Sequence, residues 1–171
     1  FDLPTTSQRN LKKVIPFMLS EEILGEVEDY FWIQGSQSEI VGIIEHQKIQ
    51  EIKDKLDPKV NKLIPIQALS SSIENLLVIL GDKAFISLQD NWYWFADKKS
   101  ILNTLALTLR KYEIKKLNIW ATEKKLELPN LDIDTEEKYF SSTKDLLNEF
   151  SQILDLKGSI NFFSKEYEKK I

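Results

Sequence analysis

The chain has 171 residues, of which 42% are hydrophobic, 11% aromatic and 29% charged. This composition is typical of a globular domain and excludes disorder as the main state. Lys and Arg number 23 against 27 Asp and Glu, and the net charge of -4 argues against nucleic acid as a partner. Cysteine is absent, which excludes disulfides, thiolate catalysis and cysteine-ligated zinc. No apolar run approaches the ~18 residues of a membrane-spanning helix, so a soluble chain is expected.

The first part of the chain predicts a helix that proline interrupts. Residues 5–7 are Thr, Thr and Ser, which can cap a helix whose apolar positions follow the helical period. Pro16 should kink or split that helix, because proline removes a backbone donor. Residues 20–23 then resemble a fresh N-cap, with carboxylates in a first turn where the helix dipole favours them.

The next segments predict a hairpin, a helix and a short strand. Residues 30–34 and 39–44 are strand-like runs on either side of a polar turn. Residues 46–56 form an amphipathic helix that stops before Asp57 and Pro58. Residues 63–66 predict a short apolar strand, with Pro65 at its end or on a sheet edge.

The second half of the chain predicts a strand meander followed by alternating helices and strands. Three strands, at 76–80, 84–88 and 92–95, are separated by short polar turns. A helix over 98–111 and a strand over 117–121 follow.

The last part is largely polar. Residues 124–139 predict a loop, with a short strand at 126–128, and Ser142 or Thr143 caps a final helix through Leu154. The alternation of helices and strands predicts an α/β or mixed α+β fold.

Residue chemistry alone offers few candidates for a site. His46 is the only histidine; it has Glu45 beside it but no Ser or Cys nucleophile at a recognisable spacing, so we expect a surface or capping role. No glycine-rich phosphate loop is present. We therefore predict no catalytic residue, no cofactor and no metal.

An acidic group offers two interpretations. It lacks the ligand alternation of a calcium loop, and no histidine is near enough to complete a metal site. A solvated face is the interpretation that composition favours, whereas a docking face would suit a basic partner. The group consists of Glu21, Glu22, Glu26, Glu28 and Asp29.

Four consecutive aromatic residues begin at Trp92. Strand alternation places Trp92 and Trp94 on one face, and Tyr93 and Phe95 on the other. Core packing is the favoured interpretation. Stacking on a base or a sugar is the alternative, but there is no basic surround to support it.

Several segments taken together resemble the cytoplasmic domain of GspL, an inner-membrane assembly-platform protein of type II secretion. In that family a strand ending in proline leads into a helix with an aliphatic-Pro-aromatic stretch and two glutamates, and an acidic segment follows. Later segments, Leu63-Ile64-Pro65 and Ile160-Asn161-Phe162-Phe163-Ser164, come in the family's order. The segments of the first block are Asp2-Leu3-Pro4, Arg9-Asn10-Leu11, Ile15-Pro16-Phe17-Met18-Leu19, Glu21-Glu22 and Val27-Glu28-Asp29.

The resemblance implies an actin-like fold related to ribonuclease H, with mixed sheets flanked by helices. The family's first strands have no counterpart, so we interpret the chain as a fragment beginning at Phe1. Residues 1–171 are then one such domain, with a sub-lobe expected over about 62–97.

The resemblance also implies a non-enzymatic role in recruitment and assembly at the cytoplasmic face of the bacterial inner membrane. Its partners would be the N-terminal domain of a GspE-like secretion ATPase and a GspM-like single-span platform protein, with a homodimer as a further expectation. Contact with the membrane would be through a span absent from this chain. The alternatives are an actin-like nucleotide-binding ATPase, a pilus-assembly relative of the same fold, and a carbohydrate-binding module that uses the aromatic strand.

The docking residues implied are those of the segment where the resemblance is strongest. There Ile23, Leu24 and Val27 lie beside the five carboxylates; alternatively, Ile23 and Val27 face inward and the acids are only solvated. A second candidate face is the helix over 46–56, with Lys48, Glu51, Lys53 and Lys55 exposed. The predicted partner-binding residues are Glu21, Glu22, Ile23, Glu26, Val27, Glu28 and Asp29.

Overall fold

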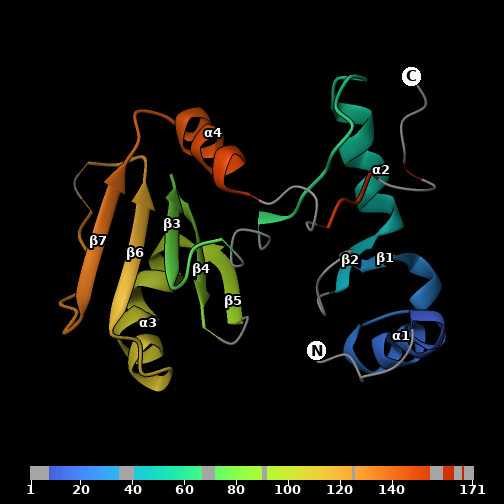
Figure 1. Ribbon diagram of the computed structural model, residues 1–171, viewed down its shortest axis with the longest axis horizontal. Helices are drawn as coiled ribbons and strands as arrows, with labels where there is room; N and C mark the ends of the chain where they lie inside the picture. Colours follow the sequence, from blue (N-terminus) through green and yellow to red (C-terminus); the bar gives the residue numbers. More distant parts are fainter. Residues whose placement is uncertain are drawn as a thin grey trace. The chain divides into compact units, whose positions relative to one another are not determined.

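The computed structural model divides the chain into two compact units. Unit 1 comprises Phe1–Pro65 and Leu156–Ile171, and unit 2 comprises Ile66–Asp155 (Figure 1). The meander expected within the 62–97 sub-lobe lies in unit 2 and shares its sheet with two later strands. The structure describes residues 8–34, 41–66, 72–89, 92–124, 126–154, 160–163 and 167.

Unit 1 contains a two-stranded antiparallel sheet with a helix on each face. Its elements are α1 (Gln8–Glu22), the 3-10 turn η1 (Val27–Asp29), β1 (Tyr30–Gln34), β2 (Val41–Glu45) and α2 (His46–Lys55). The predicted hairpin and the predicted helix over 46–56 are confirmed. The expected cap at 5–7 and the turn of the hairpin lie outside the described residues.

The two faces of the hairpin bury different clusters. Ile15 and Leu19 of α1 pack against one face, which carries Trp32, Val41 and Ile43. The other face carries Phe31 and packs on Ile49 of α2. Side-chain alternation along β1 and β2 accounts for this division, because neighbouring residues of a strand point to opposite faces.

Residues 160–163 complete the second of these clusters. Ile160, Phe162 and Phe163 are buried there, and a Cβ on Gly42 would lie 2.8 Å from Ile160 Cγ2 and 2.9 Å from Phe162 Cζ. Glycine at position 42 therefore lets the late segment pack directly on β2. Leu63 holds that segment by its backbone, donating to Asn161 Oδ1 at 2.8 Å and accepting from Phe162 N at 2.8 Å.

Two sequence predictions for the first 66 residues are wrong. The strand expected at 63–66 does not form, because the N–H of Leu63 is taken by the side chain of Asn161 and Pro65 has no N–H to donate. The helix does not restart at Ser20: α1 continues through Pro16, and Ser20 Oγ donates to Phe17 O at 2.6 Å. Burial of Ile15 and Leu19 on one face, on either side of Pro16, holds the helix together.

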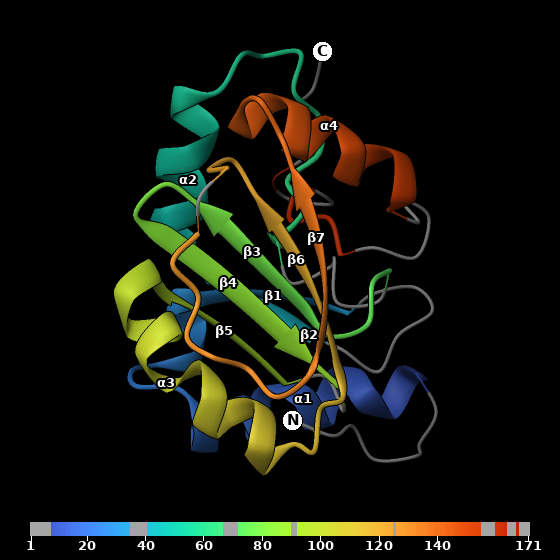
Figure 2. The same ribbon diagram turned by 90° about the vertical axis from the view of Figure 1, so that its left-hand side faces the viewer.

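Unit 2 contains a five-stranded mixed sheet of order β5-β4-β3-β6-β7. Figure 2 shows β4 running opposite to β3 and β6. The predicted meander, the helix over 98–111 and the strand over 117–121 are confirmed. The elements are β3 (Leu76–Leu80), β4 (Lys83–Leu88), β5 (Trp92–Asp97), α3 (Lys98–Lys111), β6 (Lys116–Ala121), β7 (Asp134–Tyr139) and α4 (Thr143–Ile153).

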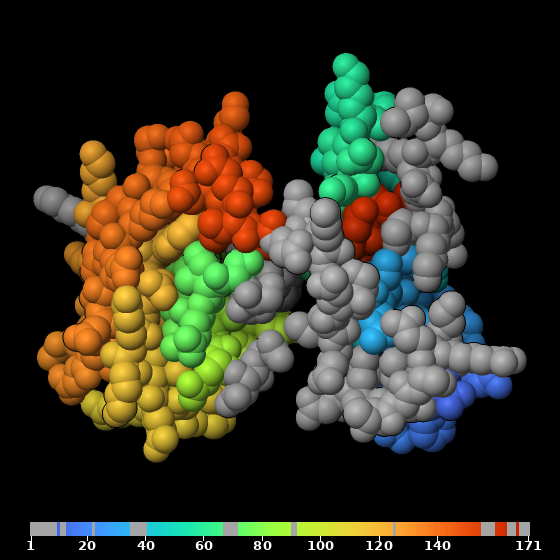
Figure 3. Space-filling model, viewed as in Figure 1, coloured from blue at the N-terminus to red at the C-terminus, as the bar shows by residue number. Residues whose placement is uncertain are grey.

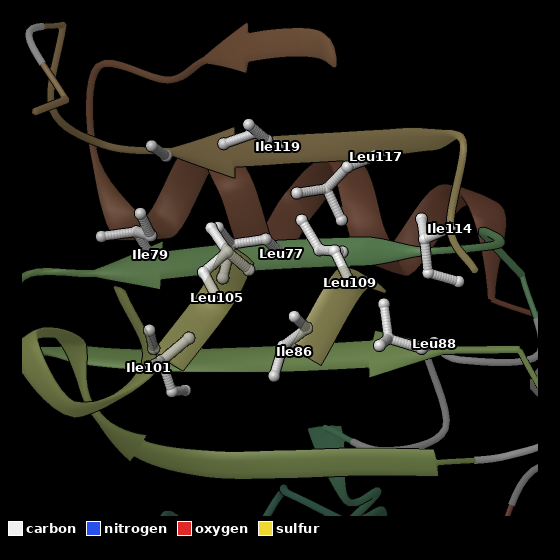
Figure 4. Close-up of a cluster of buried hydrophobic side chains, with 12 residues drawn as sticks. Leu77, Ile79, Ile86, Leu88, Ile101, Leu105, Leu109, Ile114, Leu117 and Ile119 are labelled. Atoms are coloured by element: carbon white, nitrogen blue, oxygen red, sulfur yellow. The ribbon is translucent and has the colours of Figure 1, made fainter. Parts of the chain in front are cut away.

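Helices α3 and α4 cover opposite faces of this sheet. Ile101, Leu105 and Leu109 of α3 point at the side chains of β3, β4 and β6 (Figure 4). On the other face Leu146 and Phe150 of α4 pack with residues of β3, β4 and β6. Ser142 caps α4 as predicted, since its Oγ accepts the N–H of Asp145 at 3.1 Å.

One strand of unit 2 is missed by the sequence prediction. Residues 134–139, expected to be loop, form β7, and residues 126–128 do not form the short strand expected there. All residues of β7 are exposed, so the strand has none of the apolar alternation that marks a strand in sequence. Parallel pairing with β6, from Lys116 opposite Asp134 onward, holds it in place.

Candidate functional site

The predicted docking residues lie on the turn that connects α1 to β1, here called the acidic turn (Glu21–Asp29). Helix α1 ends at Glu22, and Ile23 N still donates to Leu19 O at 3.0 Å. Gly25 then takes a φ of 130°, a conformation that L side chains rarely adopt. Tyr30 Oη donates to Leu24 O at 3.1 Å and closes the turn. The turn thus has a defined backbone rather than an arbitrary path.

The acidic turn presents its carboxylates to solvent. Glu21, Glu26, Glu28 and Asp29 are exposed, and no described cation forms an ion pair with them. Glu22 is the last residue of α1, and its side chain lies outside the described part. The segment from residue 17 to residue 30 contains no Lys or Arg, so its negative charge is uncompensated locally.

Apolar groups accompany this charge. Ile23 and Val27 are half-buried, and Leu24 between them is 96% exposed. Phe17, which the sequence prediction does not include, is 69% exposed. Its signal is present in the sequence: Phe17 is two residues from both Ile15 and Leu19, which places it on the opposite face of the helix.

The alternative face, α2, is less open than expected. Lys48 is exposed and pairs with Glu51 at 3.7 Å, but Glu51 itself is half-buried. Lys53 is also half-buried, with its Nζ 5.9 Å from the ring centroid of Tyr167. Only Lys48 and Lys55 match the predicted exposure, so α2 offers a weaker docking face than the acidic turn.

His46 has a structural setting. It is the first residue of α2, is half-buried, and its Nδ1 forms a hydrogen bond with Tyr167 Oη. The rings of Phe31 and Tyr167 lie around it, with centroids 6.2 and 5.7 Å away. These contacts fix the start of α2 beside the aromatic cluster.

The aromatic strand departs from the favoured core interpretation. Trp92 packs on Tyr112 at a ring-centroid distance of 5.1 Å, but Tyr93, Trp94 and Phe95 are exposed. They are exposed because β5 is an edge strand of its sheet.

Within the described ranges, no group of three His, Asp or Glu side chains is placed to hold a metal ion. Unit 2 has a hollow of about 270 Å³ between the end of α3 and residues 130–133, and no predicted site residue lines it. None of the described helices combines the length and hydropathy needed to cross a membrane.

Comparison with known proteins supports the fold prediction. No family model matches the chain, and no curated protein matches it in sequence. Among solved structures it is similar to the cytoplasmic domain of EpsL, an inner membrane component of the type II secretion system of Vibrio cholerae. That similarity has a TM-score of 0.66 at 17% identity and covers 98% of this chain and 73% of the other. The predicted resemblance and the mixed α/β, actin-like fold class are thereby confirmed at the level of the fold.

Proposed function

We propose that this chain is a non-enzymatic component of a type II secretion platform at the cytoplasmic face of the inner membrane. There it recruits the N-terminal domain of the secretion ATPase through the acidic turn. The observation that carries the proposal is the exposed Leu24 among carboxylates that no described cation pairs with, on a fold similar to that of a secretion component. A GspM-like platform protein is a further proposed partner, and the turn does not bear on that contact.

Apolar and charged side chains contribute differently to a docking surface. A few well-placed apolar side chains supply most of the affinity, while surrounding charges set orientation and association rate. Covering a solvated leucine releases the free energy of burying its apolar surface, and Leu24 is almost fully solvated, so a partner that covers it would gain this contribution. The ATPase surface that fits would hold an apolar pocket with Lys or Arg at its rim.

Calorimetric titration of the chain with the N-terminal domain of the cognate secretion ATPase tests this proposal. We expect micromolar or tighter binding. Glu28→Lys with Asp29→Lys should weaken binding at least tenfold at low salt, with a smaller effect at higher ionic strength because salt screens exposed charges. Leu24→Ala should weaken binding by a similar factor that salt leaves unchanged.

Matched controls separate docking from overall charge. Glu74→Lys with Glu127→Lys makes the same change in net charge at exposed carboxylates of unit 2, and should leave binding unchanged. If neither turn variant changes binding, the chain still recruits the ATPase but through another surface, and α2 is the next candidate. A folded chain that does not bind the ATPase domain would count against recruitment itself.

A further inference from the structure

Strand β5 forms one edge of the unit 2 sheet (Figure 1). Six residue pairs, from Lys83 opposite Asp97 to Leu88 opposite Trp92, join it to β4. In the described part of the chain, no strand pairs with its other side. Every second residue of such a strand directs its N–H and C=O outward. The outer side of β5 therefore offers a row of backbone donors and acceptors to another strand.

The two edges of this sheet differ in how they resist such pairing. Edge strand β7, at the orange margin of unit 2 in Figure 3, carries Asp134, Glu136, Glu137 and Lys138. Charges of this kind are how proteins prevent edge-to-edge association. Strand β5 carries no charge from Trp92 to Ala96. It is thus the unprotected edge of the sheet.

The side chains of β5 are exposed on both faces of that edge. Tyr93 and Phe95 lie opposite Ser87 and Phe85 of β4, on the face that α4 covers elsewhere, and are 42% and 49% exposed. Trp94 lies opposite Ile86, on the α3 face, and is 36% exposed. A strand added beside β5 would cover aromatic rings on both faces while pairing the free backbone groups.

We propose that the occupant is β5 of a second copy of this chain, paired antiparallel about a two-fold axis at Trp94. An axis perpendicular to the sheet keeps each face on its own side, so residues opposite one another must share a face. Centring the axis on Trp94 places it opposite Trp94 of the second copy. Tyr93 then lies opposite Phe95, and Trp92 opposite Ala96, in both halves.

This register is self-complementary in shape and charge. Tyr93 opposite Phe95 makes two cross-strand aromatic pairs, and Trp92 opposite Ala96 sets a large side chain against a small one. The one charge of the strand, Asp97, is at its end and pairs with Lys83 of the same copy at 2.5 Å. Like charges placed opposite each other usually prevent an edge strand from pairing with itself, and this register brings none together from Trp92 to Ala96.

The size of the contact sets the expected affinity. One six-residue strand covers less than the about 800 Å² per partner of a standard interface. We therefore expect a dimer of micromolar affinity. The acidic turn takes no part in this contact, so dimer formation and ATPase recruitment are tested independently.

Sedimentation of the whole chain tests the proposal. We expect a reversible monomer–dimer equilibrium in the micromolar range, weakened at least tenfold by Trp94→Lys, which sets two like charges directly opposite each other. Leu107→Lys, at a 69% exposed position on α3, is the matched control and should leave the equilibrium unchanged. A chain that stays monomeric at 100 µM or above overturns the proposal. That is the result expected if the β5 edge binds a different protein.

Cross-linking tests the register without a disruptive charge. Because the chain has no cysteine, Trp94→Cys introduces a single thiol. Directly opposite residues have Cα atoms ~4.5–5.5 Å apart, within the range that a disulfide spans. Mild oxidation should link Trp94→Cys into a dimer at least tenfold faster than Leu107→Cys. Equal rates would refute the register.

A charge-exchange pair completes the design. Chains with Tyr93→Lys and Phe95→Lys, or with Tyr93→Glu and Phe95→Glu, should each be monomeric, since like charges then lie opposite in both halves. Mixing the two should give a heterodimer, because Lys then lies opposite Glu in both cross-strand pairs. A mixture that remains monomeric, with both chains folded by circular dichroism, contradicts the pairing.

Discussion

Glu21 lies in the last turn of α1, where a carboxylate is unfavourable because the helix dipole is negative at that end. The last turn of α1 contains no basic residue to offset it. A side chain that costs stability and is exposed is a reasonable candidate for a role in binding.

We expect Glu21→Lys to raise the free energy of unfolding of unit 1 by about 0.5 kcal/mol and to weaken ATPase binding. Urea unfolding and calorimetry would measure the two effects on one protein preparation. Glu127→Lys, the same change away from any helix end, should alter neither. A loss of stability on Glu21→Lys would contradict the assignment of Glu21 to the helix end.

At the scale of the element, α4 owes its start to a reciprocal cap. Ser142 Oγ accepts the N–H of Asp145, and the Asp145 carboxylate accepts from the hydroxyls of Ser141 and Ser142. The hydroxyl of Ser141, and then that of Ser142, lowers the pKa of Asp145, because each donates to its charged form.

Ser142→Ala should destabilise unit 2 by about 1 kcal/mol at pH 7, because a helix N-terminal N–H loses its acceptor. The pKa of Asp145 is lowered in the folded state, so its contribution is present above the ordinary pKa of aspartate and is lost as pH falls through the folded value. The penalty of Ser142→Ala should therefore shrink in acid. Urea unfolding at pH 7 and about pH 3 measures it, with Thr143→Ala as a control of smaller effect.

How far elements could be predicted from sequence depends on what holds each one. Helix α3 and strands β3 and β4 are predicted correctly, because they are buried and their sequences therefore carry the apolar pattern of a helix or a strand. Strand β7 has no such pattern, because β6 alone holds it by backbone pairing. The predicted new helix start at Ser20 is wrong because Ile15 and Leu19 pack on the β1–β2 sheet, a tertiary contact that local helix propensity does not include.

The candidate site shows the same division. Sequence identifies the carboxylates of the acidic turn, since charge is a property of composition. It does not separate exposed Leu24 from half-buried Ile23, because the difference depends on where α1 ends and on the positive φ of Gly25. Likewise, the exposure of Tyr93 and Phe95 depends on strand order, which places β5 at an edge.

At the scale of the whole molecule, unit 1 is discontinuous in sequence: residues 156–171 return to it after unit 2 is complete. We expect deletion of residues 156–171 to abolish hydrogen-exchange protection in β1 and β2, because Ile160, Phe162 and Phe163 fill the cluster on one face of that hairpin. Protection in β3, β4 and β6 should persist, since the core of unit 2 is built from residues 66–155.

A milder variant is needed because the deletion could unfold the whole chain. Phe163→Ala removes one buried ring and should lower the stability of unit 1 by about 3 kcal/mol while leaving unit 2 unchanged. Equal loss of protection in both units would show instead that they unfold together.

The return of residues 160–163 to unit 1 also fixes an order of events during synthesis. A ribosome adding about 5–20 residues per second releases the whole of unit 2 before the segment that packs on Gly42 emerges. While the roughly ninety residues of unit 2 are synthesised, one apolar face of the β1–β2 hairpin remains uncovered by residues 160–163. Unit 2 can fold on the nascent chain, whereas unit 1 closes only after residues 160–163 have emerged. A chaperone that acts on this protein would find its binding site on Phe31 and its neighbours during that interval.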